Sequence, residues 1–216
     1  MALAFFDMDG TLVNGDTNDI SIGHFVDLKL APKSIIETLN EYERRFYLGT
    51  LDINEFVRFA CTPLLGLDKD KLDEVLTTTI RDHIITKVRS GALEEIKFHQ
   101  AKGNTIVIVT STMDYLVQKV AYFLGIEHYI AAPMERVDGV LTGKQCGIVP
   151  YQKDKVTRIK EFVKEHNLSL EGSYGYGDTI NDIPMLSLCT YKYAVNPNEK
   201  LLEHEFIKEC KIVDWN

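Results

Sequence analysis

Short apolar or β-prone segments alternate with helical patterns along most of this chain. The β-prone segments are Leu3–Phe6, Thr105–Thr110, Tyr129–Ala132, Ser173–Tyr176 and Tyr191–Val195. Helical periodicity, with apolar residues three and four positions apart, is found at Asp114–Leu124, Lys155–His166 and Glu199–Cys210. Strand–helix alternation with short links predicts an α/β fold, in which helices cover both faces of a parallel sheet. Sheets of this kind bind ligands beyond the carboxyl ends of their strands.

The stretch between residues 16 and 90 departs from this alternation. It shows helical periodicity throughout, as in IIETLNEYERRFYLG and INEFVRFACTPLLG, and no convincing strand. We therefore predict a core domain formed by residues 1–15 and 91–216, and an all-helical cap domain formed by residues 16–90. Because the insert begins directly after the first strand, we expect the cap to lie over the carboxyl end of that strand.

The segment ERVDGVLTGK places Asp138-Gly139 between two short β-prone runs, which predicts a tight hairpin. Its GVLTGK part looks superficially like a phosphate-binding loop. That motif, however, needs four residues between its glycines and a Ser or Thr after the lysine. Here three residues separate the glycines and Gln145 follows the lysine. We interpret the segment as a hairpin.

Composition and charge narrow the class of partner. The net charge is −8, which argues against nucleic acid or an anionic membrane as the main partner. The four cysteines are scattered without a CxxC pair, so we expect neither a disulfide framework nor a zinc site, and a reducing cytoplasm fits best. No apolar run approaches the roughly 18 residues of a membrane span.

Two carboxylates follow the first β-prone run in FFDMDGTLVN. Asp7 and Asp9 alternate with Met8, so in an extended backbone both acids face the same side. Gly10 then allows a sharp turn. A calcium-binding loop also begins D-x-D, but it follows a helix and has its glycine at the sixth position, so we exclude it. A pair of solvated turn aspartates remains an alternative at this point.

A second group of acids follows a later strand, in GYGDTINDIPML. Asp178 comes directly after the strand and Asp182 four residues later, where Asn181 or Asp182 can also begin a helix as its N-cap. Two acid groups at the ends of two parallel strands would repel each other and raise their pKa values. A hard dication relieves this repulsion, and oxygen-only ligands suit magnesium. The pattern therefore indicates a Mg²⁺ site.

Two further segments supply groups that can bind an anion. The run IVIVTSTMDYL ends a strand in Thr110, Ser111 and Thr112 before a helix begins, and hydroxyls with free N–H groups at such a point bind anions. Simple Ser/Thr capping is the alternative. The segment YQKDKV offers Lys153 and Lys155 at a predicted helix start, although most lysines are solvated surface charges.

Four segments occur in the order DMDGTLV, VIVTST, KDKV and GDTINDIPML. They resemble the four motifs of the haloacid dehalogenase (HAD) superfamily, and the resemblance covers essentially the whole chain. The insert is similar to a C1 cap, and the complete pattern is similar to subfamily IB, the phosphoserine-phosphatase-like branch. This resemblance implies a Rossmann-like core with an inserted all-helical C1 cap. An acid at Asp9, two residues after the first, resembles the phosphatases of the superfamily.

The resemblance also implies roles for residues. Asp7 would attack phosphorus and become an aspartyl-phosphate, and Asp9 would act as general acid and then general base. Mg²⁺ would be held by Asp7, by the backbone carbonyl of Asp9 and by Asp178, with Asp182 in support. The phosphate site would contain Asp7, Gly10, Thr110, the Ser111 amide and one lysine. Lys153 matches the phosphoserine-phosphatase spacing, whereas Lys155 matches other members of subfamily IB.

The substrate is less constrained. Asp16 stands where phosphoserine phosphatases have a cap glutamate, and Ala60 stands where they have an arginine, with Arg58 two residues earlier. Asp16 and Arg58 are therefore the cap residues expected to meet the substrate. Asp16, Asp19 and Glu43 could instead meet an amine.

We expect a cytoplasmic, magnesium-dependent phosphatase acting on a small phosphorylated metabolite, and neither nucleic acid nor membrane as a partner. The oligomeric state is left open. Candidate substrates are phosphoserine, histidinol phosphate, phosphocholine and phosphoethanolamine. A phosphotransferase of the same superfamily and a non-catalytic phosphometabolite-binding module are the alternatives.

Overall fold

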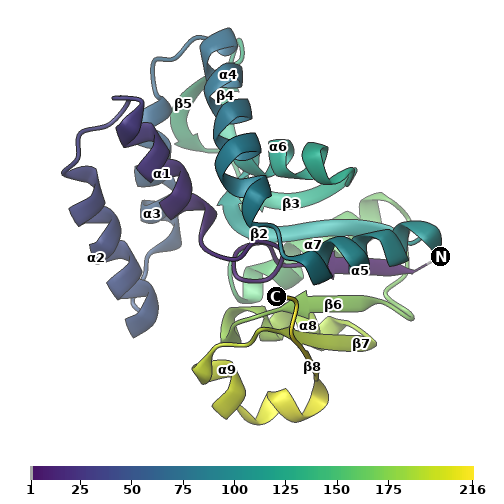
Figure 1. The fold of residues 1–216 in the computed structure, drawn as a ribbon. Coiled ribbons are helices and arrows are strands. Elements are labelled where there is room, and N and C mark those ends of the chain that lie inside the picture. The colour runs from purple at the N-terminus through teal and green to yellow at the C-terminus, as the bar shows by residue number, and fades with distance from the viewer. Residues whose placement is uncertain (1) are drawn as a thin grey trace.

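A six-stranded parallel sheet forms the centre of the protein in the computed structural model, which describes residues 2–216. The strands are β1 (Leu3–Phe6), β2 (Thr105–Met113), β3 (His128–Ala132), β6 (Tyr174–Gly177), β7 (Tyr191–Val195) and β8 (Lys211–Val213). They lie in the order β3-β2-β1-β6-β7-β8, and every neighbouring pair is parallel. All five predicted strands are present (Figure 1). The short edge strand β8 was not predicted.

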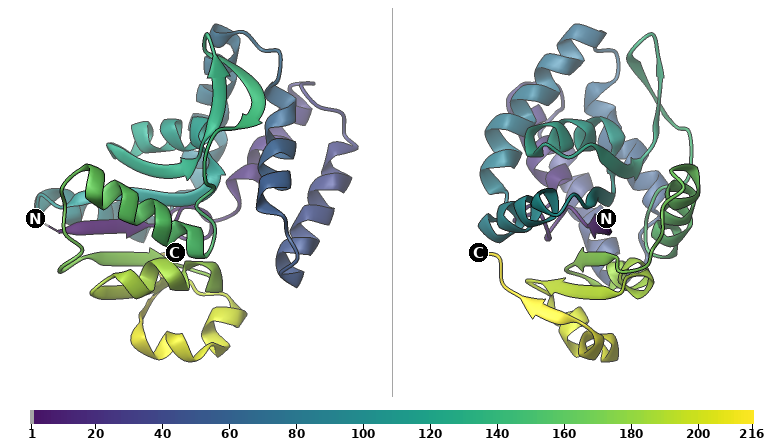
Figure 2. Two further views of the ribbon diagram at one scale, coloured as in Figure 1. Left: turned by 180° about the vertical axis from the view of Figure 1, so that it is seen from behind. Right: turned by 90° about the vertical axis from the view of Figure 1, so that its right-hand side faces the viewer.

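Helices cover both faces of this sheet (Figures 1 and 2). The helices are α5 (Ser90–Ala101), α6 (Asp114–Leu124), α7 (Lys153–Glu165), α8 (Ile183–Leu188) and α9 (Glu199–Glu203). Phe5 of β1 packs in one cluster with Ile159 of α7 and Met185 of α8, whereas Phe6 packs in another with Ile96 of α5 and Val117 of α6. Neighbouring residues of a strand point to opposite faces, so this division follows from the chain itself. The predicted α/β fold is confirmed.

The helix expected over Glu199–Cys210 is shorter than predicted. Helix α9 ends at Glu203, and a separate 3₁₀ helix follows at Glu205–Glu209. His204 divides the two because its backbone is extended, with φ −77° and ψ 137°. Further 3₁₀ turns lie at Thr62–Leu64, Ile85–Lys87 and Ile180–Asp182. Apolar periodicity did not reveal this break, because the residues on both sides of it still face the core.

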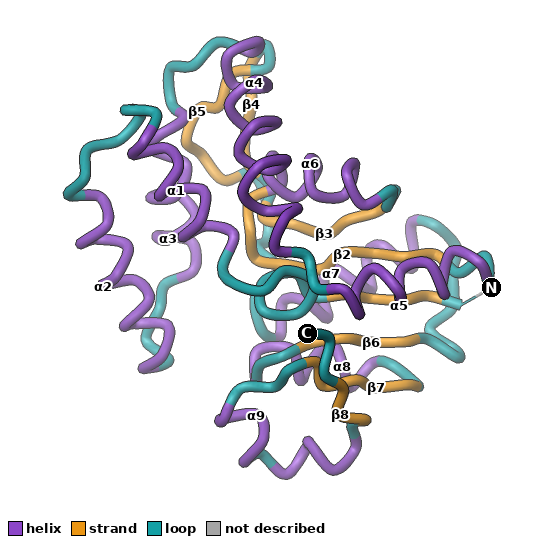
Figure 3. The backbone as a smooth tube through the Cα atoms, viewed as in Figure 1, coloured by secondary structure: helices purple, strands orange, loops and turns teal. Residues whose placement is uncertain are grey.

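A layer of helices lies beyond the carboxyl ends of the strands (Figures 1 and 3). It contains α1 (Thr17–Asp27), α2 (Ile35–Leu48), α3 (Ile53–Cys61) and α4 (Lys69–Thr79), followed by a π-helical turn at Ile80–Ile84. Asp52 and Asp68 cap α3 and α4 by accepting hydrogen bonds from first-turn N–H groups, and Gly49 ends α2 with a φ of 71°. These sequence signals explain why the insert divides into short helices.

A β-hairpin joins this helical layer from a distant part of the sequence. Strands β4 (Met134–Val137) and β5 (Val140–Gln145) pair antiparallel, and the turn between them has positive φ at Asp138 and Gly139, as predicted. The hairpin packs on α3 through β5, and it also lies next to the chain between α3 and α4, with Gly143 beside Leu65 and Gly139 beside Lys69, the first residue of α4 (Figure 2). The division into a cap of residues 16–90 and a core of the remaining residues stays a prediction. It did not anticipate that a hairpin of the core would contact the helices of residues 16–90.

The cysteines and the lengths of the helices bear on two expectations drawn from composition. Each of the four cysteines is a free thiol. Within residues 2–216, every helix is too short or too polar to pass through a lipid bilayer.

Candidate active site

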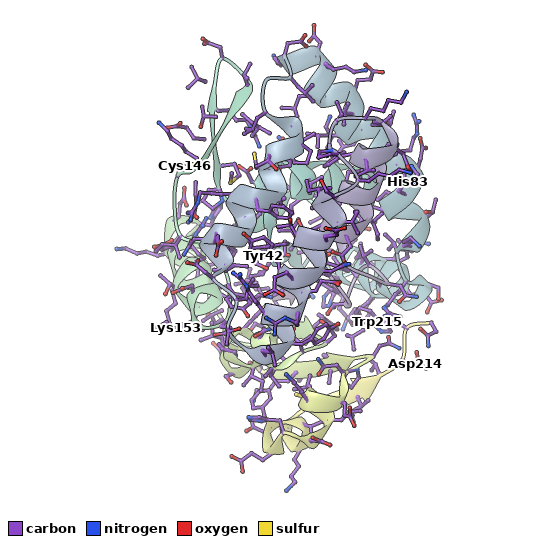
Figure 4. The ribbon with its side chains drawn as sticks, turned by 90° about the vertical axis from the view of Figure 1, so that its left-hand side faces the viewer. Tyr42, His83, Cys146, Lys153, Asp214 and Trp215 are labelled. Atoms are coloured by element: carbon purple, nitrogen blue, oxygen red, sulfur yellow. The ribbon has the colours of Figure 1, made fainter. Side chains whose placement is uncertain are left out.

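Lys155 lies at the centre of a buried cluster at the carboxyl ends of the strands. Its Nζ donates hydrogen bonds to Asp7 Oδ1 and Asp182 Oδ1, both at 2.6 Å, and to the carbonyl of Val109 at 3.0 Å. The side chain is only 3% exposed. Lys153, two residues earlier, is exposed at the start of α7 (Figure 4). Of the two lysines left open by the sequence, Lys155 is therefore the one in the site.

Asp7 is placed by the strand that precedes it. Its N–H continues the sheet by donating to the carbonyl of Tyr176 at 2.9 Å, and its side chain is almost fully buried. Burial, together with the charge of Asp182, raises the pKa of Asp7 to about 8, although Lys155 acts in the opposite direction. Burial acts to lower the pKa of Lys155, but the charges of Asp182 and Asp7 outweigh it, so that this pKa is raised.

Asp178 completes a group of three carboxylates at the end of β6. One oxygen from each of Asp7, Asp178 and Asp182 lies within 4.8 Å of the others. Burial raises the pKa of Asp178 well above its ordinary value, and the charges of Asp182 and Asp7 raise it further. Such a site lacks positive charge, since Lys155 is a single cation among three acids. An oxygen-only donor set with this excess of negative charge fits a hard dication such as Mg²⁺.

Asp182 is held differently from the other two acids. Its Oδ2 accepts hydrogen bonds from the N–H groups of Asp178 and Thr179 at 3.2 and 3.1 Å, while its Oδ1 faces Lys155. The bond from the Thr179 N–H, together with the Thr179 hydroxyl, which accepts from a backbone N–H of the first turn, forms a capping box at the start of the 3₁₀ helix Ile180–Asp182. The same side chain thus caps the 3₁₀ helix and pairs with Lys155, so it fixes the position of Lys155 relative to the end of β6.

The carboxylate of Asp9 lies outside this group of three. Its Oδ1 accepts from the N–H of Thr17 at 2.7 Å, and its Oδ2 accepts from the hydroxyl of Thr112 at 2.7 Å and that of Thr110 at 3.4 Å. Burial raises the pKa of Asp9, although the hydrogen bonds from Thr112 and Thr17 oppose the shift. The two acids of the opening motif therefore have distinct surroundings: Asp7 faces a lysine, and Asp9 faces hydroxyl and amide donors.

The threonines of β2 were only partly identified from the sequence. The hydroxyl of Thr110 donates to Asp9 Oδ2 and accepts from the N–H of Thr112 at 3.1 Å, and Ser111 lines the same cavity. The stronger contact to Asp9 comes from Thr112, which we did not single out as a site residue. The strand pattern could have identified Thr112, because alternate residues of a strand share a face and Thr112 is two residues from Thr110.

Gly10 and Asp178 approach each other more closely than any side chain at position 10 allows. A Cβ at Gly10 would lie 2.1 Å from Asp178 Oδ2, and the φ of Gly10 is +82°. The Gly10 N–H donates to the carbonyls of Val13 and Gly15, and the part of Gly10 in the phosphate site stays a prediction. Thr11, also missed, donates to Asp178 Oδ1 at 3.1 Å. Both residues therefore position Asp178.

A cavity of about 420 Å³ lies above these residues and is partly covered by the helical layer. Besides the residues described above, it is lined by acids of α1 and α2 and by five aromatic side chains: Tyr42, Phe46, Tyr47, Phe56 and Tyr151. Among the lining residues, all of which belong to the described chain, Lys155 is the one basic side chain. Tyr42 lies on the inner side of α2 and is almost fully buried (Figure 4).

Of the two cap residues expected to meet the substrate, one lines the cavity and the other lies outside it. Asp16 lines the cavity, and its Oδ1 caps α1 by accepting from the N–H groups of Asn18 and Asp19. Arg58 does not line the cavity and instead lies with Asn54, Lys144 and Gln145 in a shallow groove between α3 and β5. A helical turn of about 100° per residue directs Phe56 to the cavity and Arg58 away from it, and a contact between Arg58 and the substrate stays a prediction.

Comparisons with known proteins agree with this geometry. A profile of the haloacid dehalogenase-like hydrolases matches residues 4–187. The chain is 29% identical to a histidinol-phosphatase of Neisseria meningitidis serogroup C (strain 8013), over 99% of this chain and 96% of that protein. It is also 29% identical to a phosphoserine phosphatase of Lactococcus lactis subsp. lactis (strain IL1403), over 86% of this chain and 79% of that protein.

Solved structures share the whole fold. A protein with unknown function from Bordetella pertussis Tohama I has a TM-score of 0.89 and 26% identity, covering 100% of this chain and 99% of that chain. A phospho-aspartyl intermediate analogue of phosphoserine phosphatase has a TM-score of 0.70 and 24% identity, covering 100% of this chain and 93% of that chain. The family profile spans the residues that form the cluster around Lys155. This chain belongs to the haloacid dehalogenase-like hydrolase family.

Proposed function

We propose that the protein is a magnesium-dependent phosphatase that hydrolyses a small phosphorylated amine, with L-histidinol phosphate as the best candidate substrate. The chemistry rests on one observation: Asp7, Asp178 and Asp182 converge at the floor of the cavity, and two of them, Asp7 and Asp182, pair with Lys155 Nζ. Membership of a hydrolase family and relatives named as phosphatases support a phosphoric monoester hydrolase. The free thiols are in keeping with a cytoplasmic location.

In this proposal the residues divide the reaction into two steps. A carboxylate oxygen of Asp7 attacks phosphorus, the ester P–O bond breaks, and the phosphoryl group passes to Asp7. Asp9 gives its proton to the leaving alkoxide oxygen. Asp9 then accepts a proton from the water that attacks the aspartyl-phosphate, which releases inorganic phosphate and restores Asp7. Covalent transfer of this kind replaces one difficult step by two easier ones.

Charge around Asp7 decides how a phosphate dianion can approach it. Lys155 neutralises part of the charge of Asp7 and holds it in position. Mg²⁺ held by Asp7 and Asp178, with Asp182 in support, would supply further positive charge for the phosphoryl oxygens. Thr110 and Ser111 line the cavity beside Asp9 and are proposed to bind the phosphoryl group when it enters.

The choice of a phosphorylated amine rests on the charges of the cavity wall. Phosphoserine carries a carboxylate besides its phosphate and ammonium groups, and the lining residues offer no cation to it apart from Lys155, which is already bound to Asp7 and Asp182. L-histidinol phosphate has an ammonium group and an imidazole ring but no carboxylate. The aromatic side chains of α2 and α3 suit such a ring. The relative named histidinol-phosphatase supports the same choice.

Replacement of the nucleophile tests the chemistry. We expect Asp7→Asn to abolish turnover of p-nitrophenyl phosphate while the melting temperature stays at or above that of the wild type, since one of several buried acids is removed. EDTA should silence the wild-type enzyme and Mg²⁺ should restore it. Asp27→Asn, an exposed change on α1, is the charge-matched control. Appreciable activity of Asp7→Asn, or metal-independent turnover, would overturn the mechanism.

Substrate choice is tested by a panel of phosphomonoesters. We expect kcat/KM for L-histidinol phosphate to exceed that for phosphoserine by at least about 100-fold, because the second compound places an unpaired carboxylate in an acidic cavity. Phosphoethanolamine and phosphocholine should fall between them, since both lack the carboxylate but also lack the ring. A higher kcat/KM for phosphoserine than for L-histidinol phosphate would contradict the assignment.

A further inference from the structure

Thr112 contacts Asp9 but does not line the cavity. Its side chain is only 1% exposed, and the residues of β2 that line the cavity are Thr110 and Ser111. The Thr112 hydroxyl donates to Asp9 Oδ2 at 2.7 Å, whereas the Thr110 hydroxyl is 3.4 Å from the same oxygen. Because a substrate in the cavity does not reach Thr112, any part that Thr112 has in the reaction must act through Asp9.

A bulge in strand β2 contains Thr112. In the pairing of β2 with β3, the four steps along β2 from Val109 to Met113 match only two steps along β3. Within this bulge the N–H of Thr112 donates to the hydroxyl of Thr110 at 3.1 Å. Bulges next to active sites re-aim side chains, and here the re-aimed hydroxyl reaches Asp9.

The neighbours of the Thr112 hydroxyl leave its hydrogen for Asp9. A threonine hydroxyl has one hydrogen to donate and can accept two hydrogen bonds. Asn18 Nδ2 of α1 donates to Thr112 Oγ1 at 3.4 Å, and the Thr17 hydroxyl, which can also donate, lies at the same distance. An amide nitrogen does not accept, so the hydrogen of Thr112 is directed along the shortest contact, which joins Thr112 Oγ1 to Asp9 Oδ2.

Donors from two segments thus hold the two oxygens of Asp9. Oδ2 is held by Thr112 of β2, and Oδ1 accepts from the N–H of Thr17 at the start of α1 at 2.7 Å. The last torsion of an aspartate side chain is otherwise broad, so the carboxylate can rotate when one donor is lost. A general acid must lie within about 2.6–3.2 Å of the atom that receives its proton, and such a rotation would break this contact.

We propose that Thr112 is a positioning residue, which holds Asp9 in the orientation from which Asp9 protonates the leaving oxygen of the substrate. This inference rests on the proposed function, because it concerns the step in which Asp9 is the general acid. In that step the ester P–O bond breaks, the phosphoryl group passes to Asp7, and the proton of Asp9 passes to the leaving oxygen. Thr112 makes no bond to the substrate and keeps its own proton throughout.

Two aryl phosphates that differ in their leaving groups test the assignment. p-Nitrophenolate is weakly basic and departs without a proton, whereas the more basic phenolate of phenyl phosphate needs one. We compare kcat/KM, which reports phosphoryl transfer to Asp7 and not the later hydrolysis of the aspartyl-phosphate. For Thr112→Val we expect kcat/KM to fall by about 10- to 100-fold with phenyl phosphate and by less than about 3-fold with p-nitrophenyl phosphate.

Matched variants separate positioning from a general effect of a buried substitution. Thr112→Ser keeps the hydroxyl and should stay within about 3-fold of the wild type on both esters. Thr79→Val is the control, since Thr79 is also fully buried, donates to the carbonyl of Val75 and lies outside the cavity lining. If thermal unfolding shows that Thr112→Val does not fold, Thr112→Ala is compared with Thr112→Ser in the same way.

A double-mutant cycle shows whether Thr112 acts through Asp9. Asp9→Asn removes the proton donor, so the addition of Thr112→Val to it should cost less than about 2-fold further with phenyl phosphate. Losses that multiply in the double variant, an equal loss of Thr112→Val on both esters, or no loss with phenyl phosphate would each overturn the assignment. Absence of p-nitrophenyl phosphate hydrolysis in the wild type would instead contradict the proposed function itself.

Discussion

Replacement of Gly10 by alanine would test how the opening motif and Asp178 fit together. The new Cβ would lie 2.1 Å from Asp178 Oδ2 and 2.6 Å from its Cγ, and the φ at this position is +82°. A Cβ never approaches a carboxylate oxygen that closely, so Asp178 must move. Because Thr11 also binds Asp178 through Oδ1, the displacement breaks a second contact that positions this carboxylate.

Two contributions to the effect can be separated by a control. A left-handed backbone costs a non-glycine residue roughly 1–2 kcal/mol, which for a domain of this size lowers the melting temperature by about 2–8 °C. Gly103→Ala carries only this contribution, since Gly103 has a φ of +65° and a Cβ added there would have no other atom within 4 Å. Gly10→Ala adds the displacement of Asp178, and misplacement by about 1 Å costs about 100-fold in rate.

The assay compares the two variants on p-nitrophenyl phosphate. We expect Gly103→Ala to keep wild-type kcat/KM with a lower melting temperature. Gly10→Ala should lose about 100-fold or more in kcat/KM and should need a higher Mg²⁺ concentration for half-maximal activity. If Gly10→Ala kept activity within about 3-fold of Gly103→Ala at the same Mg²⁺ requirement, the close approach of Gly10 would have no part in positioning Asp178.

Two further predictions concern Lys155 and His99. Lys155→Met should lower kcat by about 100-fold or more. It should also lower the free energy of unfolding, measured in urea, by about 3–5 kcal/mol, because it leaves buried carboxylates without their cation. Lys153→Met, an exposed change, should alter neither quantity, and equal effects of the two substitutions would refute the assignment of Lys155 to the site. His99 is buried between Tyr176 and Asn104, and its pKa is lowered from 6.5 to about 4, by burial and then by Lys102. Between these pH values His99 is protonated in the unfolded chain but not in the folded one. The free energy of unfolding should therefore fall as the pH drops from about 6.5 towards 4, by up to about 3 kcal/mol. The difference in unfolding free energy between wild type and His99→Gln should narrow over that range, and a constant difference would show that His99 does not titrate in this way.

Much of the fold follows from local patterns. The apolar runs predicted five of the six strands of the parallel sheet, and the helical periodicity of residues 16–90 predicted that this stretch is helical, because both signals depend on neighbours a few residues apart. Strand β8 was missed because three residues of an edge strand carry little pattern. Likewise, Asp138-Gly139 predicted the hairpin turn, but the packing of the hairpin on α3 joins segments far apart in the sequence.

The amino-acid sequence by itself determined the kinds of element and the acids at the strand ends: Asp7 and Asp9 after β1, and Asp178 after β6. Only the tertiary structure decided that Lys155 rather than Lys153 reaches Asp7, that Asp9 turns towards Thr112, and that Arg58 points away from the cavity. The physical reason is that a spacing in the sequence specifies local backbone conformation, whereas burial, charge pairing and hydrogen bonding depend on which distant segments the fold brings into contact.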